Sequence, residues 1–274
     1  MMKTVFIYGL GLIGGSYASG LKKAGYTVYG KDIDAKASEI AILRGWIDNG
    51  EESEEERIHK SDIVLFALYP EEIVSAVRNC LPFVKKGVLM SDMSGIKSDL
   101  LQKLSKILPE DVSYISHHPM AGREKRGIEA ASEDLFVGAN FLIIGEKKCE
   151  ELEEIAAVLR FNHIDYLSAE KHDEVIAYLS QLPHAISVAL MNAKDPEHMT
   201  AYTGDSFRDL TRIAAINEDL WSGLFLGNKE KLIREIDAFM KEMTNLRETL
   251  VLNDRASLCA QMNSAKERRR RFDR

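Results

Sequence analysis

The chain has 274 residues, close to twice the ~150 residues of a typical domain, so two domains are expected. Hydrophobic residues make up 45% and charged residues 29% of the sequence, a balance that excludes a disordered or collagen-like chain. The net charge of −7 argues against nucleic acid as a partner, because binding phosphates requires an excess of Lys and Arg.

No segment of the sequence predicts a membrane span, because apolar runs such as 63–68 fall far short of the ~20 residues that cross a bilayer. The first residues also lack the longer apolar region and the cleavage site of an export signal. Three cysteines, Cys80, Cys149 and Cys259, lie far apart and fit neither a disulfide framework nor a paired metal motif. We therefore expect a cytoplasmic protein without a membrane partner and without a metal site.

Strand-like runs alternate with helical stretches through roughly the first 165 residues, which is typical of successive βαβ units with a parallel sheet. Several runs are almost entirely apolar, as expected where helices cover both faces of the sheet. The expected strands are 4–8, 27–30, 63–67, 88–91, 113–116, 141–144 and 164–167.

From residue 169 onward the pattern becomes helical, and we predict a domain of residues 1–168 followed by an all-α domain of residues 169–274. Asn228 is the expected N-cap of a long helix, and Asn253 or Asp254 that of the next. The long helix carries an apolar stripe of Leu232, Ile236, Phe239, Met243, Leu246 and Leu250. Such stripes predict a homodimer formed through the helical domain, with a self-contained bundle as the alternative.

A glycine-rich turn follows the first expected strand. Its sequence, Gly9-Leu10-Gly11-Leu12-Ile13-Gly14, has the G-x-G-x-x-G pattern and the strand-to-helix context of a dinucleotide site. Gly9 permits the tight turn, Gly11 lets a pyrophosphate approach the backbone, and Gly14 lets the helix pack closely on the strand. The turn therefore predicts a Rossmann-type, doubly wound parallel sheet.

The helix that begins near Leu12 and Ile13 offers free N–H groups and a partial positive charge to the phosphates. Asp32 ends the second strand, 23 residues after Gly9, close to the ~20 expected for the acid that binds an adenosine ribose. A carboxylate there would repel a 2′-phosphate. We therefore predict NAD rather than NADP as the cofactor, although Lys31 and Lys36 leave NADP open.

Polar side chains follow two further expected strands. The segment 92–97 brings the Ser94 hydroxyl and the Lys97 ammonium to the mouth of the sheet. In the second, Pro119 favours an extended conformation of His118, which suits a side chain aimed from a strand end into the cofactor crevice. An imidazole there can act as a base near neutral pH. We favour this role for His118 over that of a core histidine, and expect His117 to be structural.

Positive charge gathers just after this histidine. Of residues 123–126, Arg123, Lys125 and Arg126 are basic and only Glu124 is acidic, although the protein as a whole is acidic. This local excess of cations indicates a small anionic substrate.

Several segments, taken together and in this order, resemble the prephenate dehydrogenase family. The resemblance runs from residue 4 to about residue 250. Its segments are the glycine motif, Asp92-x-Ser94-x-x-Lys97, His118-Pro119-Met120-Ala121-Gly122 with Glu124-Lys125, Leu182-Pro183-His184, and Phe207-Arg208-Asp209-Leu210-Thr211-Arg212-Ile213-Ala214.

The resemblance implies NAD-dependent oxidative decarboxylation of prephenate to 4-hydroxyphenylpyruvate, a step toward tyrosine, with His118 taking the hydroxyl proton. It also implies that Ser94 orients this histidine and the nicotinamide. Arg212 would bind the ring carboxylate, for which a planar guanidinium is suited. His184 would contact the side-chain end of the substrate, and Glu124 and Lys125 would border the entrance.

Three other functions stay open at this point. Arogenate dehydrogenase activity differs only in an amino group on the substrate side chain, and the basic residues favour the more anionic prephenate. A β-hydroxyacid-type dehydrogenase shares the domain order but usually has its catalytic lysine or aspartate on the helical domain. A regulator that senses NAD without turnover would bind the same cofactor.

Overall fold

The computed structural model describes residues 3–122, 125–195 and 198–272. The chain divides into two compact units, Met1–Asn228 and Lys229–Arg274. Among the helices of the described residues, none combines the length and the apolar composition that a membrane span requires.

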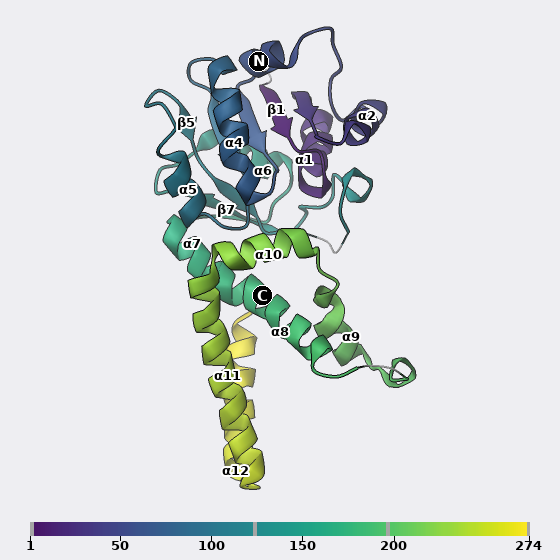
Figure 1. The fold of residues 1–274 in the computed structure, drawn as a ribbon, viewed down its shortest axis with the longest axis vertical. Helices are drawn as coiled ribbons and strands as arrows, with labels where there is room; N and C mark the ends of the chain where they lie inside the picture. Colours follow the sequence, from purple (N-terminus) through teal and green to yellow (C-terminus); the bar gives the residue numbers. More distant parts are fainter. Residues whose placement is uncertain (1–2, 123–124, 196–197, 273–274) are drawn as a thin grey trace. The chain divides into compact units, whose positions relative to one another are not determined.

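A parallel sheet lies at the centre of the first unit (Figure 1). The strands are β1 (Thr4–Tyr8), β2 (Thr27–Lys31), β3 (Ile63–Phe66), β4 (Leu89–Asp92) and β5 (Ser113–Tyr114). Within the described residues their order is β2-β1-β3-β4-β5, and every neighbouring pair is parallel. Tyr8 is paired with Lys31 and Phe66, and Phe66 with Asp92, so the carboxyl ends of four strands meet at one edge.

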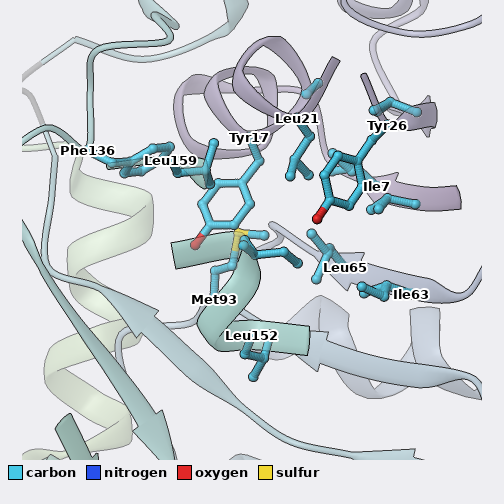
Figure 2. Close-up of a cluster of buried hydrophobic side chains, with 14 of the residues drawn as sticks. Ile7, Tyr17, Leu21, Tyr26, Ile63, Leu65, Met93, Phe136, Leu152 and Leu159 are labelled. Carbon is cyan, nitrogen blue, oxygen red and sulfur yellow. The ribbon is translucent and has the colours of Figure 1, made fainter. Parts of the chain in front are cut away.

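Alternating side chains of these strands bury two faces of the sheet, as the period of two in a strand requires. On one face Val5 and Ile7 pack with side chains of α1 (Leu12–Lys23), α2 (Ala35–Leu43) and α6 (Glu150–Val158). Figure 2 shows Tyr17 of α1 in this cluster. On the other face Phe6 packs with α3 (Glu54–Lys60), α4 (Pro70–Cys80) and α5 (Ser98–Leu104). Helices therefore cover both faces, as predicted.

A second sheet contains β6 (His117–Pro119), β7 (Asn140–Ile144) and β8 (His163–Leu167). β6 runs antiparallel to β7, whereas β8 is parallel to it. The strand expected over 113–116 is confirmed only at Ser113–Tyr114, because pairing with β4 stops there and the chain then joins the second sheet. The sequence forms one continuous run here, so nothing local marks the change of sheet.

The last part of the first unit is helical. It contains α7 (Ala169–Ile176), a π-helical turn η3 (Ala177–Gln181), α8 (Leu182–Asn192), α9 (Asp205–Thr211) and α10 (Glu218–Gly227). The π-turn lies directly before Pro183, which has no N–H to donate and whose ring would clash in a regular helix. The 3-10 turns of the chain are η1 (Leu81–Phe83), η2 (Ile128–Ala130), η4 (Thr200–Tyr202), η5 (Arg212–Ala214) and η6 (Arg270–Phe272).

The structure changes from strands to helices at Ser168, whose hydroxyl accepts a hydrogen bond from the Lys171 N–H and caps α7. The domain division at residue 168 stays a prediction, since the compact units meet at residue 228.

The second unit contains α11 (Lys229–Val251) and α12 (Arg255–Arg269). Asp254 caps α12 by accepting a hydrogen bond from the Ser257 N–H, as the sequence predicted. Within the unit, Gln261 of α12 donates to the Thr249 hydroxyl of α11, which ties the two helices together.

Candidate active site

The glycine turn between β1 and α1 has a different steric demand at each glycine. Gly9 has a φ of +84°, and a Cβ there would collide with the carbonyl oxygen of Ala67. A Cβ on Gly14 would collide with the carbonyl oxygen of Gly9, so the helix packs directly on the turn. At Gly11 a Cβ would meet no atom within 4 Å. The open space therefore lies above Gly11, where the fingerprint needs room for a pyrophosphate.

The start of α1 is uncapped by any side chain, because Gly11 occupies the N-cap position. The N–H groups of Leu12 and Ile13 thus lie in the first turn of α1, where backbone N–H groups have no hydrogen-bond acceptor within the helix. Asp32 follows β2 at the same edge of the sheet and accepts hydrogen bonds from the N–H groups of Leu10 (2.6 Å) and Asp34 (2.9 Å). Its carboxylate is thereby fixed beside the turn. These residues fit the pyrophosphate and ribose of a dinucleotide.

A buried ion pair stands at the end of β4. Lys97 Nζ lies 2.7 Å from Asp92 Oδ1, and both side chains are fully buried. Burial opposes ionisation of Asp92, but the adjoining ammonium outweighs it and the pKa of this carboxyl lies below its usual value. Lys97 Nζ also donates to the carbonyl of His117 at 2.7 Å. The Lys97 ammonium, which the sequence placed at the mouth of the sheet, is thus buried there and holds β6 against β4.

His117 lies in the core, as expected. The Ser91 hydroxyl donates to the Ile115 carbonyl, so its oxygen accepts from Nδ1 of His117 at 2.6 Å. The Tyr17 hydroxyl, 2.9 Å away, then donates to Nε2. Burial lowers the pKa of His117 to about 3, so the ring is neutral and both of its nitrogens are satisfied.

His118 is joined to a second histidine and an aspartate. Its Nδ1 lies 2.9 Å from Nε2 of His172, and Nδ1 of His172 lies 2.8 Å from Oδ1 of Asp173. Asp173 also accepts hydrogen bonds from the N–H groups of Lys97 (2.9 Å) and Ser98 (2.8 Å), and so caps the start of α5. His172 and Asp173 were not among the residues predicted from the sequence. The local signal for them is an adjacent His and Asp in the first turns of an amphipathic helix.

The imidazole of His118 is neutral at neutral pH. Burial lowers its pKa well below the usual value, and positive charge at His172, Lys97 or His117 would lower it further. Its ring faces the loop after β4, since a Cβ added to Gly95 would lie 3.9 Å from His118 Cε1. A neutral, half-buried imidazole at this sheet edge can accept a proton from a bound ligand.

Ser94 lies in the same loop and is buried. Its hydroxyl donates to the Ile96 carbonyl at 2.6 Å, and its N–H donates to Asp92 Oδ1 at 2.9 Å. Both groups are thus used within the loop, whereas the ring of His118 is bonded to His172. A role of Ser94 toward this histidine or the cofactor stays a prediction.

His184 and Arg212 belong to the helical part of the first unit. Nδ1 of His184 donates to the Ser180 carbonyl at 2.8 Å, and its ring stacks on Trp221 of α10 with centroids 3.7 Å apart. Burial lowers the pKa of His184, so this ring too is neutral. Arg212 opens the turn η5, which packs against α8, and its side chain is exposed. The structure thus brings the helix of His184 and the turn of Arg212 together.

The predicted residues at the entrance are only partly described. Lys125 and Arg126 are exposed on the chain after β6. Glu124 and Arg123 lie outside the described residues. Across the described part of the chain, no cluster of three or more His, Cys, Asp or Glu side chains could hold a metal ion.

Comparison with known proteins identifies the family. Residues 17–163 match the nucleotide-binding domain of prephenate dehydrogenase, and residues 168–264 match its dimerization domain. The chain belongs to the prephenate dehydrogenase family. It is therefore an oxidoreductase, which confirms the predicted enzyme class and the resemblance found in the sequence.

Prephenate dehydrogenases of other organisms match most of the chain. Prephenate dehydrogenase of Lactococcus lactis is 31% identical over 89% of this chain and 70% of its own length. That of Bacillus subtilis is 27% identical over 98% of this chain and 76% of its own length. The crystal structure of prephenate dehydrogenase from A. aeolicus with hydroxyphenyl propionate and NAD+ is 28% identical, covers 99% of both chains and has a TM-score of 0.88. The predicted fold, a Rossmann-type domain followed by helices, is thereby confirmed.

Proposed function

We propose that this member of the prephenate dehydrogenase family catalyses the NAD-dependent oxidative decarboxylation of prephenate to 4-hydroxyphenylpyruvate, a step of tyrosine biosynthesis. The observation that carries the proposal is the neutral imidazole of His118, which faces Gly95 in the loop after β4. That loop leaves the same sheet edge as the glycine turn after β1, so base and nucleotide site share one edge. The A. aeolicus relative binds hydroxyphenyl propionate, whose ring and side chain resemble those of the proposed product.

The reaction removes a hydride and a carboxylate from one ring. NAD, when bound, supplies the acceptor for the hydride that leaves the carbon bearing the hydroxyl group. His118 takes the proton of that hydroxyl on a ring nitrogen as the carbonyl forms. The ring carboxylate then leaves as carbon dioxide, its bonding electrons aromatise the ring, and the phenolate oxygen takes the proton back from His118.

The choice of NAD is supported by Asp32 and by the relative that contains NAD+. The Asp32 carboxylate is fixed beside the glycine turn through the Leu10 N–H. A negative charge at this place accepts hydrogen bonds from a ribose and repels a 2′-phosphate.

We assign the substrate contacts as the sequence predicted them. Arg212 binds the ring carboxylate, because a guanidinium offers two parallel donors and stays charged. His184, held by the Ser180 carbonyl and stacked on Trp221, contacts the side-chain end of the substrate. Lys125, with Glu124, borders the entrance, and Ser94 lies toward the nicotinamide.

We also propose that the enzyme acts as a homodimer. The match of residues 168–264 to a dimerization domain supports this assembly. Apolar side chains exposed on α11, which include Ile233, Met240, Met243 and Leu250, offer a surface for the second copy.

The test is a side-by-side assay of prephenate and arogenate with NAD and NADP, followed by absorbance at 340 nm. We expect NADH to form fastest with prephenate and NAD. The His118→Asn enzyme should bind NAD as the wild type does but turn over ~10² times more slowly, the usual scale for a positioned base. Preference for arogenate, or NAD binding without NADH, would contradict the proposal.

A further inference from the structure

We infer that His172 and Asp173 form a positioning relay that keeps the proton of neutral His118 on Nδ1 and leaves Nε2 free to accept the substrate proton. This inference rests on the proposed function, in which His118 is the base. It adds two residues that do not touch the substrate but decide which nitrogen of His118 can act.

The direction of the relay follows from Asp173. Its carboxylate accepts two backbone N–H groups, those of Lys97 and Ser98, at 2.9 and 2.8 Å. Burial opposes its ionisation, but the hydrogen bonds from His172 and Ser98 keep the pKa of Asp173 below its usual value. An ionised carboxylate only accepts hydrogen bonds. Nδ1 of His172, 2.8 Å away, must therefore carry the hydrogen.

The hydrogen on Nδ1 of His172 also determines which nitrogen of His118 carries a hydrogen. Burial lowers the pKa of His172, against the opposing effect of Asp173, so its ring is neutral and carries one hydrogen. With that hydrogen on Nδ1, its Nε2 is an acceptor. Nδ1 of His118, 2.9 Å from this acceptor, must donate. The second nitrogen of His118 is consequently left with its lone pair, and among the described residues nothing donates to it.

The relay is held rigidly. His172 is fully buried in the first turns of α7, where the Ser168 cap fixes the start of the helix. The Asp173 carbonyl accepts a further hydrogen bond from the Asn228 side chain at 2.9 Å. The His172 ring therefore cannot turn without breaking its hydrogen bonds to Asp173 and His118. Orientation of a catalytic imidazole by a carboxylate follows the same logic in serine protease triads, where the aspartate fixes the tautomer.

The competing explanation is that His172 and Asp173 only fasten α7 to α5 and β6. Both explanations predict some loss of stability when the pair is altered. They differ in the tautomer of His118 and in which substitutions restore turnover.

The first test is the tautomer of His118, measured by two-bond ¹H–¹⁵N NMR on the full enzyme with ¹⁵N-labelled histidine. The His118 signal is assigned by its loss in His118→Asn. We expect the wild type to carry its hydrogen on Nδ1. A hydrogen on Nε2 in the wild type overturns the relay, and this measurement needs no folded His172 variant.

The second test is a pair of substitutions at His172. The asparagine amide in His172→Asn reaches Asp173 but not His118, whereas the longer glutamine in His172→Gln brings an acceptor oxygen toward Nδ1 of His118. We expect kcat to fall about tenfold or more in His172→Asn, the value of one hydrogen bond. KM for prephenate and Kd for NAD should stay within about twofold, and His172→Gln should recover most of the loss.

The control is His163→Asn, a substitution of an exposed histidine on β8, which should leave all three constants unchanged. Equal loss of turnover in His172→Asn and His172→Gln, with the hydrogen still on Nδ1 of His118 in both variants, overturns the relay. A wild type that does not oxidise prephenate but has the expected tautomer refutes the proposed function and still supports the relay, so the two failures are distinguishable.

Discussion

His118 and Lys97 are two titratable side chains at the same sheet edge, yet burial affects them differently. Lys97 is fully buried, which lowers its pKa, and its partner Asp92 and the His117 carbonyl offset part of the lost solvation. Among the described residues, none of the groups that shift the pKa of His118 is an acid, and burial leaves its ring uncharged. The charged pair therefore serves the scaffold, while the uncharged imidazole is the base that we propose for the reaction.

Arg212 is the residue whose substitution most directly tests substrate recognition. We expect Arg212→Ala to raise KM for prephenate by about 10- to 100-fold, because hydrogen bonds to a charged group contribute about 1.5–3 kcal/mol. The affinity for NAD, measured by isothermal titration, should not change. Arg208→Ala is the control, because the Arg208 guanidinium is already engaged by Asp205 and the Thr203 carbonyl. An unchanged KM for Arg212→Ala would remove this residue from the substrate site.

At the scale of the element, the glycines of the turn between β1 and α1 differ in whether packing requires them. Gly14 has no room for a side chain, because the helix packs on the Gly9 carbonyl. Gly11 has room, and its φ of −70° suits alanine. One motif thus contains a glycine that packing requires and another that packing does not require, for which we propose a role in binding the ligand.

Two alanine substitutions test this division. Gly14→Ala should lower the free energy of unfolding by about 1–3 kcal/mol through overpacking. Gly11→Ala should leave the melting temperature unchanged or slightly raised, since it restricts the unfolded chain. It should nevertheless weaken NAD binding at least tenfold, because the methyl group takes the space meant for the pyrophosphate. Thermal unfolding and NAD titration of both variants decide the matter, and normal NAD binding by Gly11→Ala would argue against this cofactor pose.

At the scale of the whole molecule, the second unit leaves apolar side chains uncovered along α11. Ile233, Met240, Met243 and Leu250 are each at least half exposed. Their spacing keeps them near one face of the helix, as in a packing stripe. Exposed apolar stripes of this kind mark surfaces that bind another protein chain.

We predict that the wild type has the mass of two chains by light scattering and that Met240→Glu with Met243→Glu shifts it toward one chain. Burying two carboxylates in an apolar interface is unfavourable, because each loses its solvation without a partner. Lys241→Glu makes the same net charge change on another side of the same helix and should leave the dimer intact. A double variant that stays dimeric would place the interface elsewhere.

The sequence by itself determined the parallel sheet, the glycine turn with Asp32 and the position of His118 at a sheet edge. Each of these depends on local rules, namely the alternation of side chains in a strand, the missing Cβ of glycine and the restriction that Pro119 imposes on the residue before it.

Only the tertiary structure decided the switch of residues 117–119 into a second sheet, the burial of Lys97 and the link from His118 to His172 and Asp173. The hydrogen bonds that join His118 to His172 and the start of α5 to Asp173 link residues 54 to 76 positions apart in the chain. Such contacts arise from the packing of whole elements against one another, and no short-range pattern of residues encodes them.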